Sequence, residues 1–277
     1  MKEKLLAFYG LKYPPFLGDI PVDAFYIYPA LENFLWRIQH HFVQEGGFAL
    51  ISGESGTGKS ITLRLLSNRL EGIRDVKLGI ITHPSARLSD FYRELGDVFG
   101  VSLSVHNRWH SFKTLRERWW QHIENSLFRL VLFIDEAQEM PASVLNELRL
   151  LTSAKLDSRS LLSVIFAGDE RFNEKLRREE LIPLGSRIRF RFKIESSSVQ
   201  QLSQSLQHLL VCAGNPNLMS QELIQVLCEH ALGNYRVLCT MANELLVAAL
   251  KQEKMQLDEK LFFDCFSTPT PTTKRKS

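Results

Sequence analysis

The stretch from Gly53 to Ser60 combines residue types and spacing that point to phosphate chemistry. It fits G-x-x-x-x-G-K-S and stands between an apolar run and a helical pattern. Glycines let the backbone turn tightly and aim N–H groups at phosphates, and the N-terminus of the next helix attracts the same charge. Lys59 would reach the β- and γ-phosphates, and the Ser60 hydroxyl would take one Mg²⁺ position. An accidental glycine-rich turn is the alternative, which the flanking patterns disfavour. We therefore predict a nucleoside-triphosphate site made by Gly53, Glu54, Ser55, Gly56, Thr57, Gly58, Lys59, Ser60 and Ile61.

Two acids, Asp135 and Glu136, directly follow the apolar run from Leu130 to Ile134. A strand that is buried on both faces cannot carry carboxylates within its length, so acids at its carboxyl end should face a ligand crevice. Asp135 would hold Mg²⁺ through water, and Glu136 would orient and polarise the attacking water. The alternative is that they cap the next helix, since Pro141 suits a helix start. The phosphate-binding motif upstream favours the catalytic interpretation.

Strands and helices must position these residues, and the pattern of apolar residues predicts that the two alternate along the chain. Apolar runs typical of strands cover 48–52, 77–82, 130–134, 162–167 and 190–194. Helical patterns cover 30–44, 59–71, 88–99, 111–127, 141–153 and 170–178. Alternation of this kind, with apolar strands, indicates a parallel sheet covered by helices on both faces.

Four regions follow from these patterns. Residues 1–46 form a lead-in with a first helix, and residues 47–197 form the α/β nucleotide-binding domain. Strand patterns stop after it, and residues 198–266 predict a helical lid with helices near 199–213, 220–231, 235–251 and 258–266. Residues 267–277 are polar, rich in Pro and Thr, and basic at the end, which predicts a disordered tail.

Composition excludes several classes of protein. The 277 residues are 44% hydrophobic and 23% charged, which is ordinary for a globular protein. A formal net charge of +3 does not by itself indicate nucleic-acid binding. The four cysteines form no C-x-x-C pair, so neither a zinc site nor a redox motif is supported. Without a signal peptide or an apolar run of membrane-spanning length, we expect a cytoplasmic protein that does not contact a membrane.

Taken in order, the motifs resemble those of the AAA+ ATPases, and among these the ExeA-like and TniB/TnsC-like branch. The resemblance runs from residue 8 to about 250, and the segments that carry it are Phe8-Tyr-Gly-Leu with Pro15-Phe16, Gly53–Ser60, Ile134-Asp-Glu-Ala-Gln138, Phe166-Ala-Gly-Asp169, Ser186-Arg187 and Gly233-Asn-Tyr-Arg236. It implies a P-loop α/β fold with a five-stranded parallel sheet and a C-terminal all-helical lid. It also implies ATP and Mg²⁺ as ligands, ATP hydrolysis, and assembly into a homo-oligomeric ring or filament.

The resemblance further implies roles for two arginines. Arg187 stands just before the last strand, where this family places an arginine finger that reaches a neighbouring subunit's γ-phosphate. Arg189 and Arg191 have the same side-chain parity and could share that role, or all three could be the solvent-facing side of the strand. Arg236 matches the sensor-2 arginine, which contacts the γ-phosphate from the lid.

Asp169 departs from the family pattern at the end of the fourth strand. Relatives usually carry Asn, Thr or Gln at this sensor-1 position, and an acid beside a triphosphate is electrostatically unfavourable. As a catalytic candidate, Asp169 could bind water; alternatively it could pair with an arginine or cap the helix beginning near Glu170. The departure bears on the rate of hydrolysis and leaves the prediction of nucleotide binding intact.

For the use of ATP, the sequence favours regulation of transposition. In this hypothesis the protein forms an ATP-dependent oligomer on duplex DNA and recruits or activates a transposase. The resemblance places DNA-facing residues between the second and third strands, where basic residues cluster; the candidates are Arg87, Arg108, His110 and Lys113. The alternative for each is a solvated helix face or a core contact.

Two other functions compete with this one. An ExeA-like ATPase for assembly of a secretion apparatus fits the same motifs, but those proteins continue into a membrane span and a cell-wall-binding domain, so we expect this alternative less. A scaffold controlled by ATP occupancy, with little hydrolysis, would explain Asp169 but not the full set of catalytic residues.

Overall fold

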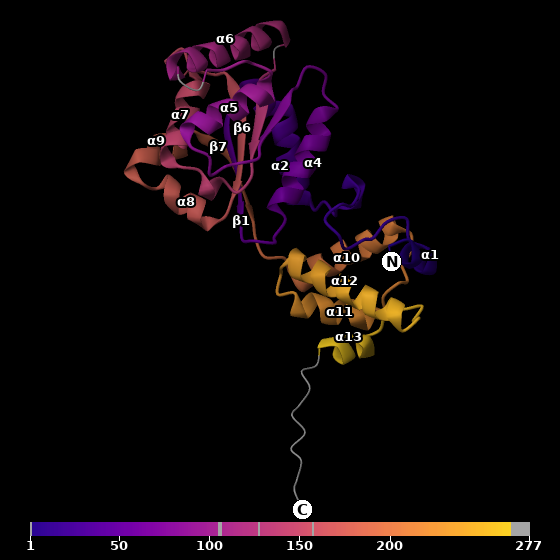
Figure 1. The fold of residues 1–277 in the computed structure, drawn as a ribbon. Helices are drawn as coiled ribbons and strands as arrows, with labels where there is room; N and C mark the ends of the chain where they lie inside the picture. Colours follow the sequence, from indigo (N-terminus) through magenta and orange to yellow (C-terminus); the bar gives the residue numbers. More distant parts are fainter. Residues whose placement is uncertain (1, 105–106, 127, 157, 267–277) are drawn as a thin grey trace, which may run out of the picture. The chain divides into compact units, whose positions relative to one another are not determined.

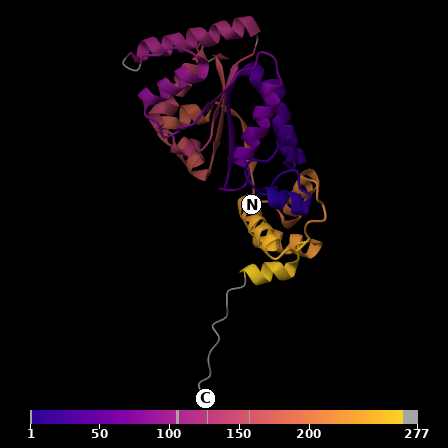
Figure 2. The same cartoon turned by 45° about the vertical axis from the view of Figure 1, so that its right-hand side comes forward.

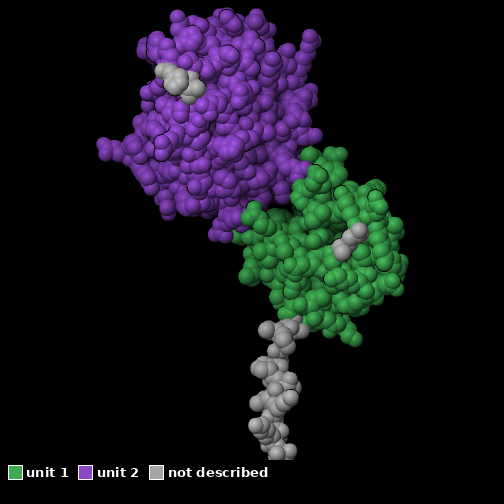
Figure 3. Space-filling model, in the orientation of Figure 1, with its two compact units in different colours: residues 1–26, 196–277 green, residues 27–195 purple. Residues whose placement is uncertain are grey.

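The protein is described by a computed structural model covering residues 2–104, 107–126, 128–156 and 158–266. The chain divides into two compact units, which Figure 3 colours separately. One unit comprises residues 27–195, and the other joins residues 1–26 to the segment that begins at 196. These boundaries differ from the expected ones, because the first half of the lead-in packs with the C-terminal helices instead of preceding the sheet. The tail expected to be disordered, 267–277, lies outside the described residues.

A five-stranded parallel sheet runs through the larger unit in the order β2-β3-β6-β1-β7 (Figures 1 and 2). In the register of the sheet, Ala49 on the interior strand β1 pairs with Ile165 of β6 on one side and Phe190 of β7 on the other. The α/β P-loop fold class is therefore confirmed. The strands are β1 (Gly47–Gly53), β2 (Leu78–Ile81), β3 (Leu130–Ile134), β6 (Leu162–Gly168) and β7 (Ile188–Ile194).

Helices cover both faces of this sheet (Figures 1 and 2). They include α4 (Lys59–Glu71), α5 (Leu88–Phe99), α6 (Arg108–Ser126), α7 (Ala142–Thr152), α8 (Glu170–Leu176) and α9 (Ile182–Gly185), with short 3-10 turns η3 (Ala137–Glu139) and η4 (Glu179–Leu181). A small antiparallel pair that the sequence patterns did not predict, β4 (Ser153–Ala154) with β5 (Arg159–Ser160), follows α7.

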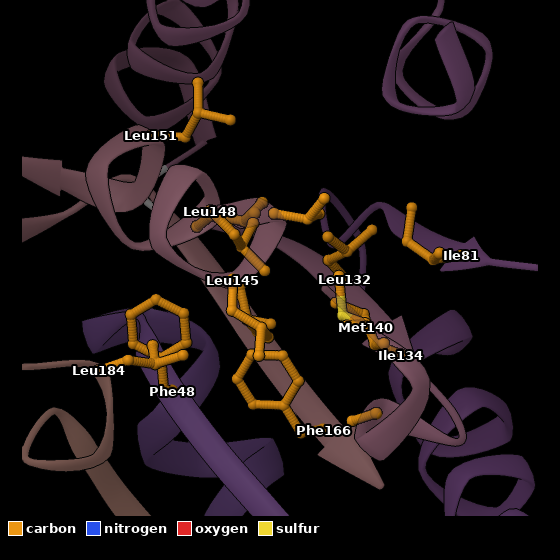
Figure 4. Close-up of a cluster of buried hydrophobic side chains, with 14 of the residues drawn as sticks. Phe48, Ile81, Leu132, Ile134, Met140, Leu145, Leu148, Leu151, Phe166 and Leu184 are labelled. Atoms are coloured by element: carbon orange, nitrogen blue, oxygen red, sulfur yellow. The ribbon is translucent and has the colours of Figure 1, made fainter. Parts of the chain in front are cut away.

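The main core lies between the sheet and α7, and Figure 4 shows its side chains. Strands β3 and β6 are buried at every position, as central strands of a parallel sheet must be. Each fully buried leucine or phenylalanine contributes roughly 2 kcal/mol to the free energy of unfolding. The buried Ser163 within β6 is compensated by a hydrogen bond to the Phe42 carbonyl oxygen, and the acidic side chains follow the carboxyl ends of the strands. The residues drawn include Phe48, Leu132, Ile134 and Phe166 from the strands and Leu145, Leu148 and Leu151 from α7.

The predicted helix over 30–44 is interrupted. It forms as α2 (Pro29–Arg37), a π turn η2 (Ile38–Phe42) and α3 (Val43–Glu45). Ile38, Phe42 and Val43 are all fully buried. At 100° per residue an α-helix would turn Val43 away from Ile38, and the wider π turn keeps the three side chains on one side.

The second unit is a helical bundle. Its helices are α1 (Lys2–Tyr9), α10 (Val199–Ala213), α11 (Gln221–His230), α12 (Tyr235–Lys251) and α13 (Glu259–Phe266), with a short turn η1 (Val22–Ala24). Side chains fix where three of these helices begin: Ser198 forms a capping box with Gln201, Ser220 caps α11 and Asn234 caps α12. Among the described residues, none of the helices combines the length and hydrophobicity needed to cross a membrane.

Candidate active site

The loop between β1 and α4 has the backbone that its glycines predict. Gly56 and Gly58 have φ values of 81° and 114°, which side chains disfavour. Gly53 is required for a different reason, since a Cβ there would lie 2.7 Å from the Ile194 carbonyl oxygen. Thr57 closes the turn by donating its hydroxyl to the Glu54 carbonyl at 2.8 Å. These features restrict the backbone of the loop that precedes α4.

Lys59 is folded against this loop. Its Nζ donates to the carbonyl oxygens of Gly53 at 3.0 Å and Glu54 at 2.9 Å, and the residue is 6% exposed. The ammonium group is therefore fixed at the mouth of the loop by two neutral acceptors. A phosphate oxygen would be a stronger acceptor, because hydrogen bonds between ionised groups are about twice as strong as neutral ones.

Ser60 and Asp135 meet although 75 residues separate them. The Ser60 hydroxyl donates to Asp135 Oδ2 at 2.7 Å, which joins the start of α4 to the carboxyl end of β3. A hydroxyl and a carboxylate are hard oxygen donors of the kind that Mg²⁺ takes beside nucleotide phosphates. The two residues therefore fit the predicted Mg²⁺ position, and the two motifs form one site.

Glu136 follows with an unusual backbone. Its φ of 50° and ψ of 42° are left-handed, and its N–H donates to Asp135 Oδ1 at 2.9 Å. The two neighbouring carboxylates have different partners: Asp135 accepts from Ser60 and from the Glu136 N–H, and Glu136 accepts from Gln138. The Glu136 carboxylate accepts a hydrogen bond from Gln138 Nε2, which restricts its orientation. The sequence patterns gave Gln138 no role.

Asp169 does two of the things that we considered for it. Its carboxylate caps α8 by accepting from the Arg171 N–H at 2.9 Å, and it also pairs with the Arg171 guanidinium at 2.8 Å. Burial acts to raise the pKa of Asp169, but hydrogen bonds from Arg171 and the nearby charge of Lys59 outweigh it and lower the pKa. Arg171, which the sequence patterns did not single out, therefore compensates the acid at this position.

The three arginines near β7 are all engaged. Arg187 Nη1 donates to the Pro183 carbonyl, Arg189 pairs with Glu45 at 3.3 Å, and Arg191 donates to the Gly185 carbonyl at 2.9 Å. Arg189 and Arg191 are exposed and Arg187 is half-buried. Strand β7 is an edge of the sheet, so these side chains lie where a second copy could approach. The finger role of Arg187 stays a prediction.

Arg236 lies in the first turn of α12, as the pattern Gly-Asn-Tyr-Arg predicts. Its N–H donates to Asn234 Oδ1 at 3.0 Å. Gly233 has a φ of 81°, and a Cβ there would lie 2.9 Å from the Ser197 carbonyl oxygen. The turn therefore requires glycine, and it sets the position of Arg236 as the second residue of α12. The contact of Arg236 with nucleotide remains a prediction.

The four DNA candidates have different surroundings. Arg87, His110 and Lys113 are exposed, and Lys113 makes a surface pair with Glu117 at 3.7 Å. Arg108 is also exposed, but it makes two hydrogen bonds to Glu147, one of 2.9 Å from Nε, and Glu147 is only 2% exposed. This ion pair gives Arg108 a structural partner within the chain, which its sequence context did not predict.

Comparisons with known proteins agree with this geometry. Residues 40–176 match the family model of the AAA domain, which places the P-loop, both acids and Asp169 within it. General secretion pathway protein A of Aeromonas hydrophila is 28% identical over 248 residues. The match takes in 87% of this chain but 44% of that relative, so this chain spans less than half of its length.

Solved structures share the fold. Cdc6p from Pyrobaculum aerophilum has a TM-score of 0.68 at 15% identity, over 88% of this chain and 67% of that one. The ORC1 protein of Aeropyrum pernix, solved in complex with DNA, has a TM-score of 0.66 at 18% identity, over 90% and 67%. Domain III of the Thermotoga maritima replication initiation protein DnaA has a TM-score of 0.62 at 17% identity, over 90% and 96%. At these identities the likeness establishes the AAA+ fold alone.

Proposed function

We propose that this AAA-domain protein is a Mg²⁺-dependent ATPase whose nucleotide state controls its assembly with further copies of itself. The observation that carries this proposal is the hydrogen bond between Ser60 and Asp135, which brings the phosphate-binding loop and the acidic pair to one point. Loop N–H groups and Lys59 would bind the phosphates, and Ser60 and Asp135 would hold the metal. Bound Mg²⁺ would neutralise charge that develops on the phosphates.

The remaining residues divide the chemistry among them. Glu136 would orient the attacking water and accept its proton, since its carboxylate is held by a neighbouring amide. Arg187 of a second copy would stabilise charge on the γ-phosphate, and Arg236 would keep the sensor-2 role that the sequence predicts for it. Asp169 would act through Arg171 and the α8 cap, which limits its repulsion of the triphosphate.

Substitution of Lys59 tests the site directly. Lys59→Ala should lower ATP turnover by about a hundredfold or more, because the preorganised charge on the phosphates is lost. Steady-state phosphate release measures this, with the exposed Lys251→Ala as the matched control. Turnover at the parent rate in Lys59→Ala would refute the assignment of the loop.

For the task that ATP serves, we propose assembly of a secretion apparatus. The support is the relative named General secretion pathway protein A, whose match takes in 87% of this chain. Our sequence-based preference against this task relied on the lack of a membrane span. Because the match spans 44% of that relative, the lack of a span in this chain does not separate the two tasks.

A second candidate is the regulator of transposition that binds duplex DNA and a transposase. Its support is the fold shared with a DNA-bound ORC1 protein and the exposed side chains of Arg87, His110 and Lys113. Sedimentation and electron microscopy with a slowly hydrolysed ATP analogue, with and without duplex DNA, separate the candidates. Filaments or rings that require DNA favour transposition, and ATP-dependent oligomers indifferent to DNA favour secretion. A monomer under every condition would contradict nucleotide-controlled assembly.

A further inference from the structure

The side chain of Gln138 links two parts of the candidate site. Its Nε2 donates to Glu136 Oε2, and its Oε1 accepts from the main-chain N–H of Asp169 at 3.2 Å. Only this orientation of the amide gives both neighbours a complementary partner, because a carboxylate accepts and an N–H donates. Gln138 therefore connects the turn after β3 to the end of β6.

The surroundings of Gln138 keep this link in place. The residue is only 5% exposed, and Lys175 Nζ donates to the carbonyl oxygens of both Gln138 and Met140. Gly168 leaves space for the amide, since a Cβ at that glycine would lie 3.0 Å from Gln138 Oε1. Main chain and side chain are thus fixed from separate elements, η3, α8 and β6. A polar side chain that merely filled space would not need this arrangement.

We propose that Gln138 is a positioning residue that holds the Glu136 carboxylate in its catalytic orientation and ties it to the main chain of Asp169. This inference rests on the proposed ATP hydrolysis, in which Glu136 orients water. Asp169 stands at the carboxyl end of β6, beside the γ-phosphate in the proposed site. A displacement of that strand end would move the Gln138 amide and with it the carboxylate.

The first test is Gln138→Ala. It should lower kcat for ATP about 10- to 100-fold, as loss of an orienting partner commonly does, and leave KM within about twofold. Gln225→Ala, an exposed glutamine on α11, is the matched control. In the nucleotide-free protein, the Asp169 amide should exchange its hydrogen faster in Gln138→Ala than in the parent, because its acceptor is gone.

The second test is Gln138→Glu, which keeps an acceptor for the Asp169 N–H and preserves the volume. It places a second carboxylate against Glu136, and adjacent carboxylates share a proton. The acid limb of the kcat profile should therefore move to higher pH, while amide exchange at Asp169 stays as in the parent. The other charged groups around this pair are Asp135, Glu139, Asp169, Arg171, Lys59 and Lys175.

The outcomes separate the inference from the proposed function. A parent protein that hydrolyses no ATP overturns both. An active parent with unchanged kcat and pH profile in both variants overturns the positioning role alone. A variant that raises KM at constant kcat also overturns it, since that would indicate a role in binding.

Discussion

At the scale of single residues, the site concentrates its unusual features at Glu136 and its neighbours. A non-glycine residue in the left-handed region costs about 1 kcal/mol or more, and such strain persists only where surrounding contacts hold it. Here Asp135 holds the Glu136 main chain and Gln138 holds its side chain. In the proposed site, these two consecutive carboxylates have different tasks, the metal for Asp135 and the attacking water for Glu136.

Replacement of Glu136 tests this division of roles. Glu136→Gln should bind ATP with parental affinity but lower kcat by about 10²- to 10³-fold, because an amide cannot accept the proton of water. Binding of a fluorescent ATP analogue and phosphate release measure the two effects. Glu174→Gln, exposed on α8, is the control. Loss of nucleotide binding in Glu136→Gln would mean that Glu136 is structural.

At the scale of elements, one buried carboxylate joins three helices. Glu147 on α7 accepts hydrogen bonds from Tyr92 on α5 at 2.5 Å and from Arg108 on α6. Burial acts to raise the pKa of Glu147, but these hydrogen bonds and the charge of Arg108 outweigh it and lower the pKa. Burial and the adjacent carboxylate raise the pKa of Tyr92. The cluster therefore links α6, which carries three of the four predicted DNA residues, to α5 and α7.

Arg108→Ala should therefore destabilise the protein by about 2 kcal/mol, the scale of a lost hydrogen bond to a charged group that is left buried. Urea unfolding at neutral pH measures the change. Lys113→Ala, on the same helix with an exposed partner, should change stability by less than about 0.5 kcal/mol. If Arg108→Ala instead keeps parental stability and loses only DNA affinity, the DNA role is favoured.

The same cluster predicts a dependence on pH. Because the folded-state pKa of Glu147 is lowered, its contribution to stability is present above its ordinary pKa and is lost as the pH falls through the folded value. The difference in unfolding free energy between the parent and Arg108→Ala should shrink as the pH falls. Urea unfolding between pH 7 and pH 3 measures it, and a difference that is constant with pH would contradict the ion-pair account.

At the scale of the whole molecule, our proposal has Arg187 of a second copy complete the site. Strand β7 is an edge of the sheet and presents Arg189, Arg191 and Lys193 on its exposed side, with Arg187 just before it. Charged side chains on an edge strand discourage pairing of that edge with a strand of another chain. In the proposed assembly, these arginines would instead attract the triphosphate bound by a second copy.

Mixing two inactive variants tests a shared site. Arg187→Ala and Lys59→Ala should each be nearly inactive, but their mixture should recover part of the parental ATPase activity, because some interfaces then combine an intact loop with an intact finger. Arg74→Ala, whose side chain is 96% exposed, is the control and should keep full activity. No recovery would exclude Arg187 as a finger in trans. If a mixture of Arg189→Ala and Lys59→Ala recovers activity instead, Arg189 would be the finger.

The sequence by itself determined the features that depend on local order along the chain. The glycine spacing, the apolar strand runs and the acids after β3 predicted the fold and the nucleotide loop, because strand and helix periodicity and tight turns are properties of neighbouring residues. Tertiary structure decided partnerships over distance that no sequence pattern predicted: Gln138 with Asp169, and Arg108 with Glu147. Each depends on which strand ends and helix faces meet in space, and no local pattern encodes that.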